Sequence, residues 1–267
     1  MADIEFATDE RGGVTVMRDG HPQSHVQPDD PRLLVFEYVQ HFALVLDLLP
    51  PGPLRVTHVG GAGLTLARYL QATRPGSPQI VLEPDVELTE SVRREIPLPR
   101  QHRIRVRPAD GAAGVRALRD ASADVIVLDA YADGRVPAEL TGSAFLAECA
   151  RVLAPGGLLL ANLADEPGMR YIRRVVATLP ASLPEVALLA TNEVLKGRRF
   201  GNVVLLASGA PAPLDVRGLR RAAARADFPT GLRANAEVAA LVRGVPPFGE
   251  TGERSPAPPE LGGWRVR

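Results

Sequence analysis

The sequence predicts an α/β protein whose main sheet is mostly parallel and ends in an antiparallel hairpin. Three observations predict it: short apolar runs alternate with helical patterns from residue 54 onward, the runs are apolar almost throughout, and the last two are joined only by a loop. Continuous apolar runs are typical of strands that helices cover on both faces, since neither side of such a strand meets water. The runs at 185–190 and 201–208 are expected to form the closing hairpin.

Each element can be justified in order along the chain. The seven strands expected in the sheet are 54–59, 79–83, 103–107, 123–130, 158–164, 185–190 and 201–208. Apolar residues at helical spacing predict the connecting helices at 64–73, 86–96, 111–120, 142–154 and 168–179. A further helix begins near Pro31 and stops at Pro50-Pro51-Gly52, because proline lacks the N–H group that would continue it.

Composition divides the chain into four parts. Residues 1–30 carry short β patterns around turn residues, which predicts an N-terminal β-strand module. Residues 31–210 form the nucleoside-binding sheet domain with the helix that opens it, and 211–245 form C-terminal helices. Residues 246–267 are rich in proline and glycine, and we expect this tail to wrap the surface or to be loose.

The charge and cysteine content exclude several classes of protein. Lys+Arg and Asp+Glu number 31 each, so no net field attracts nucleic acid or an anionic membrane. Cys149 is the only cysteine, which excludes a disulfide within the chain and a cysteine-based zinc site. No apolar run approaches the ~20 residues that span a bilayer, and acids stand where a signal peptide needs positive charge. We therefore expect a cytoplasmic protein with no metal, no nucleic-acid partner and no membrane association.

Polar features follow four neighbouring strands of the predicted sheet, where each strand ends. They are Gly60-Gly61-Ala62-Gly63, Glu83, Asp110-Gly111 and Asp129. In an open parallel sheet, ligands bind beyond the carboxyl ends of the strands. Glycine lets the backbone approach a ligand and opens a helix whose N-terminus favours negative charge. The pattern predicts a nucleoside site, in which Glu83 accepts from ribose hydroxyls, Asp110 accepts from an adenine amino group, and Asp129 faces the reacting group.

The glycine loop distinguishes between two classes of nucleotide. Dinucleotide enzymes use G-x-G-x-x-G, whose third glycine lets the helix pack closely on the strand. Here the frame is Gly61, Gly63 and Leu66, so the third glycine is absent. Enzymes that use S-adenosylmethionine relax this position, and their ligand has no pyrophosphate. The loop therefore favours an adenosyl sulfonium.

Several segments also carry a likeness to one known family. They are RDGHPQS at 18–24, FEYVQHF at 36–42, HVGGAG at 58–63, VLEPD at 81–85, PADG at 108–111, VIVLDAYADG at 125–134 and RRFGNVVLLAS at 198–208. With these segments the chain resembles the spermidine synthases, the polyamine aminopropyltransferases. The resemblance implies a Rossmann-like class I methyltransferase sheet and a homodimer or homotetramer. It also implies transfer of an aminopropyl group from decarboxylated S-adenosylmethionine, or a related adenosyl sulfonium, to a small-molecule amine.

The resemblance and the strand-end pattern together give a set of candidate site residues. We predict Asp129 and Tyr131 as catalytic, Asp129 as the base that accepts the amine proton and Tyr131 as a group that stacks on or hydrogen-bonds the substrate. The nucleoside would be held by Gln23, Gly60, Gly61, Gly63, Glu83, Asp110, Gly111 and Asp129. The acceptor would be held by Tyr38, Asp133 and Asp165.

Two acidic positions of the family are not acidic here. The family's glycine-loop aspartate aligns with Gly63, and the second aspartate of its D-x-x-D loop aligns with Ala132. A diamine carries two positive charges, and binding it without carboxylates would leave those charges unpaired. Glu37, Asp133 and Asp165 are the candidates to replace the missing carboxylates. For Asp165 the sequence favours the N-cap of the helix that follows it over a contact with the acceptor.

Two alternative functions stay open on the sequence. One is a methyltransferase that uses S-adenosylmethionine itself, because glycine at position 63 removes a repulsion with the carboxylate of the methionine. The other is a nucleoside-binding protein with little catalysis.

Overall fold

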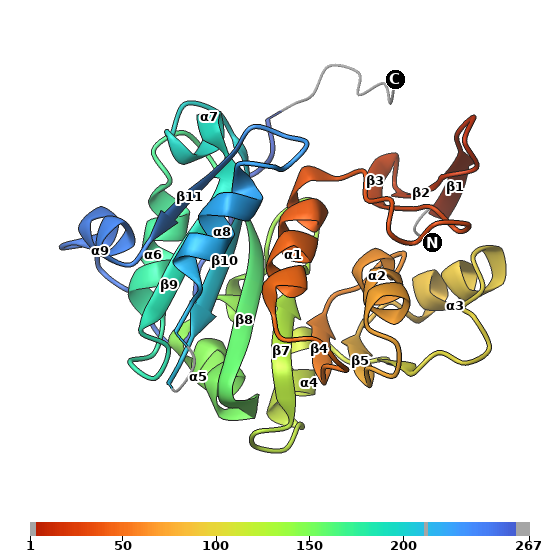
Figure 1. The fold of residues 1–267 in the computed structure, drawn as a ribbon, viewed down its shortest axis with the longest axis horizontal. Helices are drawn as coiled ribbons and strands as arrows, with labels where there is room; N and C mark the ends of the chain where they lie inside the picture. The colour runs from red at the N-terminus through yellow and green to blue at the C-terminus, as the bar shows by residue number, and fades with distance from the viewer. Residues whose placement is uncertain (1–3, 211–212, 260–267) are drawn as a thin grey trace.

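The computed structural model describes residues 4–210 and 213–259, in which a large sheet and a small sheet lie side by side (Figure 1). The large sheet has eight strands in the order β11-β9-β10-β8-β7-β4-β5-β6. Their bounds are β4 Val56–Val59, β5 Gln79–Leu82, β6 Ile104–Arg107, β7 Ala123–Leu128, β8 Leu153–Asp165, β9 Glu185–Thr191, β10 Gly201–Ser208 and β11 Thr230–Ala234. Strands β4 to β8 pair in parallel, and β10 runs antiparallel to both β8 and β9. The predicted mixed sheet with its antiparallel closing hairpin is confirmed, but it has eight strands where seven were expected, because β11 from the expected C-terminal helices adds to its edge.

Helices cover both faces of the large sheet. Their bounds are α1 Glu37–Leu48, α2 Thr65–Thr73, α3 Val86–Glu95, α4 Gly111–Arg116, η1 Ala138–Leu140, α5 Ser143–Val152, α6 Arg170–Thr178, α7 Asn192–Leu195, α8 Val216–Ala223 and α9 Ala236–Val242. One core cluster packs α1, α2 and α8 on the sheet, and a second packs α4, α5 and α6 on the opposite face. Strand β7 shows the alternation, since Val125 and Val127 enter the first cluster while Ile126 and Leu128 enter the second.

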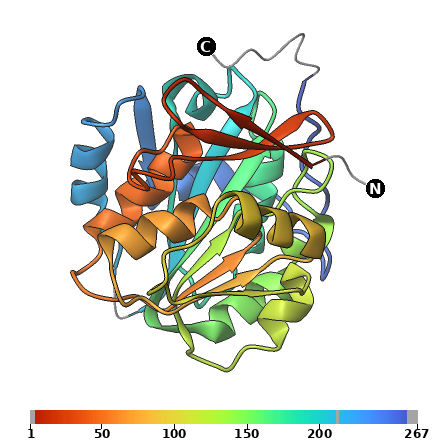
Figure 2. The ribbon, with the colours of Figure 1, turned by 90° about the vertical axis from the view of Figure 1, so that its right-hand side faces the viewer.

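The small sheet is the N-terminal module. Strands β1 (Ile4–Thr8), β2 (Val14–Arg18) and β3 (His21–Val26) pair in sequence order as antiparallel neighbours. Asp19 and Gly20 both have positive φ, which is the geometry of a two-residue hairpin turn between Arg18 and His21. The module lies across α2 and α3 (Figure 2), where Val16 and Val26 pack on α3. It therefore sits on the helix that begins at the glycine loop.

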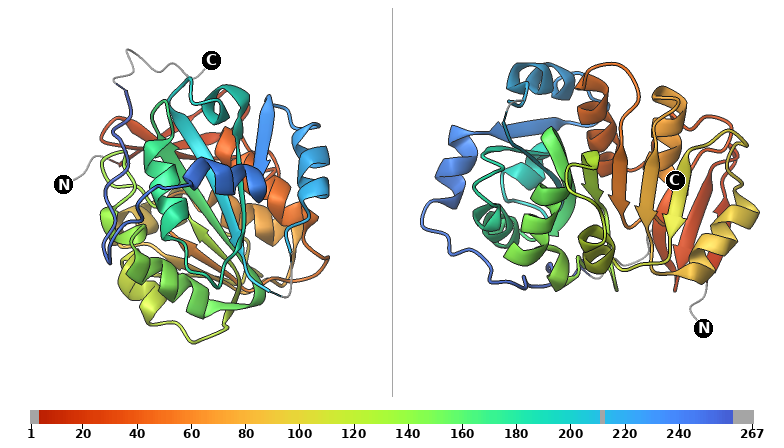
Figure 3. Two further views of the ribbon diagram at one scale, coloured as in Figure 1. Left: turned by 90° about the vertical axis from the view of Figure 1, so that its left-hand side faces the viewer. Right: turned by 90° about the horizontal axis from the view of Figure 1, so that it is seen from below.

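The segment after α9 is part of the folded body as far as residue 259. It leaves α9 and runs along the α5–α6 side of the molecule (Figure 3, left). Phe248 and Ser255 on this segment are 5% and 0% exposed. The described part of the tail, residues 246–259, thus packs on the folded body.

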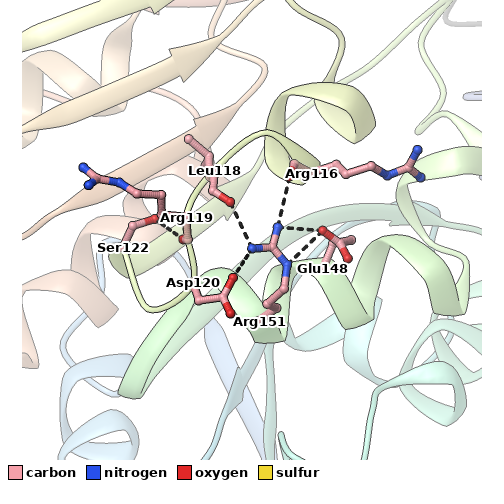
Figure 4. Close-up of polar contacts among 7 residues, drawn as sticks. All are labelled: Arg116, Leu118, Arg119, Asp120, Ser122, Glu148 and Arg151. Carbon is pink, nitrogen blue, oxygen red and sulfur yellow. Dashed lines mark hydrogen bonds and ion pairs between the residues drawn. The ribbon is translucent and has the colours of Figure 1, made fainter.

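Arg151 fixes the end of the large sheet that lies opposite the strand-end loops. Its guanidinium pairs with Asp120 and Glu148 and donates to the carbonyls of Leu118 and Arg116, at 3.0 and 3.1 Å (Figure 4). These contacts join α4, α5 and the turn that enters β7. They hold the strand that carries Asp129 at its other end.

Two further observations concern the helices. Cys149 on α5 is fully buried in the larger core cluster. Within the part of the chain that the structure describes, no helix combines the length and the apolar character needed to cross a bilayer.

Candidate active site

Backbone hydrogen bonds fix the glycine loop between its two neighbouring strands. The N–H of Gly60 donates to the carbonyl of Leu82, and the N–H of Asp129 donates to the carbonyl of Val59, both at 2.9 Å. Gly60 has φ +83°, and a Cβ at this position would lie 2.3 Å from the carbonyl oxygen of Asp129. Glycine meets both requirements, since it adopts positive φ without strain and has no side chain to clash. The loop and the end of β7 are therefore in direct contact.

Glu83 lies beside this loop, at the end of β5. Its half-buried carboxylate accepts hydrogen bonds from the N–H of Asp85 at 3.1 Å and of Ala62 at 3.4 Å. Burial raises the pKa of Glu83, and the backbone hydrogen bonds partly oppose that rise. The predicted contact of this carboxylate with a ribose stays a prediction.

Asp110 and Gly111 form the start of α4. Asp110 is exposed and caps the helix, since its Oδ1 accepts from the N–H of Ala113 at 2.8 Å. Gly111 packs so closely on β4 that a Cβ would lie 2.4 Å from the side chain of Val59. The structure gives both residues a local role in the turn, and their predicted contact with adenine stays a prediction.

Asp129 is the centre of a polar cluster drawn from three elements. Its Oδ1 accepts from the Asn162 amide on β8 at 3.0 Å, and its carboxylate also accepts from the hydroxyl of Tyr38 on α1. Tyr131, two residues beyond Asp129, donates its hydroxyl to the Asn162 carbonyl at 3.2 Å. The structure thus brings together the two predicted catalytic residues and one predicted acceptor residue.

The surroundings of Asp129 make it a stronger base than an ordinary aspartate. Desolvation raises its pKa to about 6, although the hydrogen bonds from Asn162 and Tyr38 act to lower it. Burial and the neighbouring Asp129 charge raise the pKa of Tyr38 well above its usual range, so its hydroxyl stays protonated as a donor. A carboxylate with a pKa near the working pH is suited to accept a proton during a reaction.

Asn162 is a functional candidate that the predicted site residues did not include. Its side chain is 2% exposed, and its Oδ1 has no hydrogen-bond partner within residues 4–210 and 213–259. An unpaired buried acceptor costs about 1–3 kcal/mol, so a ligand N–H would be favourable at this oxygen. The signal in the sequence was its position on the strand next to Asp129, which becomes meaningful once the strand order is known.

Two predicted acceptor residues lie apart from this cluster. Both oxygens of Asp165, which is 1% exposed, accept backbone N–H groups at 2.8 Å, one from Glu166 and one from Ile172. Asp133 is exposed at the tip of a turn and pairs with Arg254 at 3.0 Å. Their predicted contact with the acceptor stays a prediction, and the structure engages both carboxylates elsewhere.

The N-terminal module, which carries Gln23, contacts the glycine loop, which carries Gly61 and Gly63. The N–H of Gly63 donates to Ser24 Oγ at 2.9 Å, and a Cβ at position 63 would lie 2.3 Å from the same oxygen. An aspartate therefore does not fit at position 63 while β3 is seated as it is. Gln23, next to Ser24, donates to the His21 carbonyl at 3.3 Å. Gly61 packs against the side chain of Val81.

The described residues contain no group of three or more His, Cys, Asp or Glu side chains arranged to hold a metal ion. The cluster around Asp129 consists of that carboxylate, the amide of Asn162 and the phenol groups of Tyr38 and Tyr131.

The raised pKa of Asp129 predicts that Asp129→Asn stabilises the protein at neutral pH. The folded-state pKa lies above the unfolded one, so ionising Asp129 lowers the free energy of unfolding as pH rises from about 4 to about 6. Asparagine removes that cost of at most about 3 kcal/mol and loses one hydrogen bond of about 1 kcal/mol. In urea unfolding, the free energy of unfolding of Asp129→Asn should exceed that of the wild type at pH 7 but not at pH 4.

Asp124→Asn is the control of opposite sign. The side-chain and backbone hydrogen bonds of Arg55 lower the pKa of Asp124, so its contribution is present at neutral pH and lost on acidification. This variant should be destabilised at pH 7. A gain for Asp129→Asn that is equal at both pH values would contradict the raised pKa.

Comparison with known proteins bears on the fold and on the family that the chain resembles. No family model matches the chain. The chain is 23% identical to the polyamine aminopropyltransferase of Neisseria meningitidis over 255 residues, which is 92% of each protein. It is 29% identical to a probable spermidine synthase from Corynebacterium glutamicum, whose crystal structure matches over 93% of both chains with a TM-score of 0.85.

The chain is spermidine synthase-like. The spermidine synthase-like chain also matches human methyltransferase-like protein 13, crystallised in complex with SAH, with a TM-score of 0.58 at 22% identity over 78% of this chain and 93% of that chain. This second likeness concerns the fold alone and is consistent with a class I methyltransferase-like sheet. The resemblance to spermidine synthases and the fold class are confirmed, and the likeness indicates a transferase enzyme.

Proposed function

We propose that this protein transfers an aminopropyl group from decarboxylated S-adenosylmethionine, or a related adenosyl sulfonium, to a small-molecule amine. The observation that carries the proposal is the desolvated Asp129 carboxylate, held by Asn162 and Tyr38 on a residue whose backbone carbonyl contacts the glycine loop. The names of the relatives support the reaction class.

The reaction requires a neutral amine held in line with a carbon–sulfur bond. The amine nitrogen forms a bond to the aminopropyl methylene carbon that is attached to the sulfonium sulfur. The bond between that carbon and the sulfur breaks, and methylthioadenosine leaves. Asp129 accepts the proton that the nitrogen loses and orients the nitrogen before attack. Asn162 Oδ1, which lacks a partner within the described residues, is suited to accept a second N–H of the same amine. Tyr131 borders this position.

The nucleoside half of the proposed site consists of the glycine loop and the residues around it. Glu83 would accept from the ribose hydroxyls and Asp110 from the adenine amino group, with Gly111 and Gln23 beside them. The loop favours a nucleoside without pyrophosphate, because Leu66 stands where dinucleotide enzymes have the third glycine of G-x-G-x-x-G. We further propose that the protein acts in the cytoplasm in polyamine metabolism, as a homodimer or homotetramer without nucleic acid.

A methyltransferase that uses S-adenosylmethionine is the second candidate, and position 63 favours it. Gly63 offers no carboxylate, and Ser24 lies against the place where one would begin. A donor that retains the methionine carboxylate would therefore meet no repulsion at this point.

Calorimetry with the two donors, followed by an amine panel, tests the proposal. Decarboxylated S-adenosylmethionine should bind more tightly than S-adenosylmethionine, and at least one amine should gain an aminopropyl group detectable by mass spectrometry. Preference for the carboxylated donor, with methyl transfer, would establish the second candidate instead. Tight binding of either donor without turnover on any amine would favour a nucleoside-binding protein with little catalysis.

A further inference from the structure

The missing carboxylates of the acceptor half leave three candidate replacements, and the structure gives each of them another partner. Asp165 accepts two backbone N–H groups at 2.8 Å. Asp133 pairs with Arg254 at 3.0 Å, and Glu37 pairs with Arg199 at 3.9 Å. The Asp133 and Glu37 pairs are both exposed, and the Glu37 pair is the longer of the two.

The partner of Asp133 belongs to the segment 245–259, here called the C-terminal strap. Phe248 anchors the strap on α6: its N–H donates to Thr178 Oγ1 at 2.7 Å, and the Arg174 guanidinium lies 4.1 Å from its ring centre. The ring is also 5.9 Å from that of Tyr171. These contacts anchor the strap along α6.

The middle of the strap caps α5. The N–H groups of Ser143 and Ala144 donate to the carbonyls of Gly249 and Glu250, at 2.9 and 3.3 Å. No side chain caps this helix, so the strap carbonyls take the place of an N-cap side chain. A Cβ at Gly142 would lie 2.1 Å from the Glu250 carbonyl oxygen, so the start of α5 is shaped to receive the strap.

The end of the strap binds the acceptor loop, which we define as residues 129–136. Ser255 is fully buried and pairs with Val136 in both directions, accepting its N–H at 2.9 Å and donating to its carbonyl at 3.2 Å. Arg254 donates to the Ala132 carbonyl at 2.7 Å as well as to Asp133. The strap thus holds the outer half of the loop whose inner half carries Asp129 and Tyr131.

The acceptor loop has a defined conformation at its tip. Asp133 and Gly134 have φ +51° and +68°, and Ala132 and Arg135 exchange backbone hydrogen bonds at 2.9 and 3.1 Å. These are the features of a two-residue turn with both central residues at positive φ. The turn and Arg254 together determine where the Asp133 carboxylate lies.

We propose that the acceptor of this enzyme is an amine with a single positive charge, and that the C-terminal strap sets this preference. Arg254 pairs with the Asp133 carboxylate, so that this charge is not available to the acceptor. Ser255 positions the loop that carries Asp129. The proposal rests on the proposed function, and it specifies the substrate class of the same site. A second ammonium group would enter without the carboxylates that such a charge requires.

Matched amines test the substrate class. Butylamine and 1,4-diaminobutane have the same carbon chain and differ in the second amino group. The wild-type protein should favour butylamine by about tenfold or more in kcat/KM, which is about 1.4 kcal/mol of discrimination. Arg254→Gln should narrow the ratio by releasing Asp133, and adding Asp133→Asn should restore it. Preference of the wild type for the diamine would overturn the proposal, and loss of diamine turnover in Glu37→Gln would identify Glu37 as the diamine ligand.

Hydrogen exchange tests the strap independently of turnover. Ser255→Ala should speed exchange of the Val136 amide and raise the KM of the amine, while donor affinity stays within about twofold. Arg243→Gln is the control, because the Arg243 side chain has no hydrogen bond or ion pair among the described residues. Unchanged exchange in both Ser255→Ala and Arg254→Gln would overturn the role of the strap. If no amine is turned over by any variant, the proposed function fails, and the exchange result still decides whether the strap holds the loop.

Discussion

Asp129→Asn is expected to lower kcat by about 10²–10⁴-fold, the range for loss of a general acid or base. Asparagine has nearly the same shape, still accepts from Asn162 or Tyr38, and cannot accept a proton from the attacking amine. Donor affinity should change by no more than a few-fold, because Asp129 contacts the glycine loop through its backbone carbonyl. Single-turnover measurements with saturating donor would separate the two effects.

The same experiment includes its own pH test. In the wild type, kcat should rise as pH increases through about 6, since only the ionised Asp129 accepts a proton. The variant should lose this inflection along with its turnover. Asp124→Asn, at the other end of β7, should keep both. Turnover that survives in Asp129→Asn would show that another group is the base.

Glu83→Gln is expected to weaken binding of the nucleoside by about 10–100-fold. Hydrogen bonds to charged groups contribute about 1.5–3 kcal/mol each, and glutamine replaces a carboxylate that can accept both ribose hydroxyls with one neutral acceptor. Calorimetry with methylthioadenosine measures this loss without depending on the acceptor.

Glu87→Gln provides the matched control, because Glu87 is exposed in the first turn of α3 on the same connection. The thermal unfolding of both variants should be measured to check that they are folded. This matters because Glu83 also accepts from the Ala62 and Asp85 N–H groups. Unchanged nucleoside affinity in a folded Glu83→Gln protein would mean that the nucleoside binds elsewhere.

The strands of the large sheet could be predicted because burial on both faces leaves a continuous apolar run in the sequence. Strand β11 was missed for the opposite reason. It is an edge strand that pairs only with β9, and only Leu232 and Ala234 on it are buried, so its sequence carries little apolar signal. Strand β3 carries a weak signal of its own, because Asp19 and Gly20 just before it and Pro22 within it are residues typical of turns.

The strand-end rule predicted where Asp129, Glu83 and the glycine loop lie relative to one another. It could not predict which carboxylates remain accessible to a ligand. Asp133 is engaged by a residue 121 positions away in the chain, and Asp165 is engaged by the backbone of α6. Such pairings depend on how distant segments pack, and no local pattern in the sequence records them.

The buried Cys149 has a practical consequence for experiments. Desolvation raises the pKa of its thiol, and the thiolate is the reactive form, so maleimide reagents should leave it unmodified. A cysteine introduced at an exposed position such as Asp133 would then be the single site of labelling. A fluorophore attached there would report movement of the loop tip in solution without removal of any native residue from the interior.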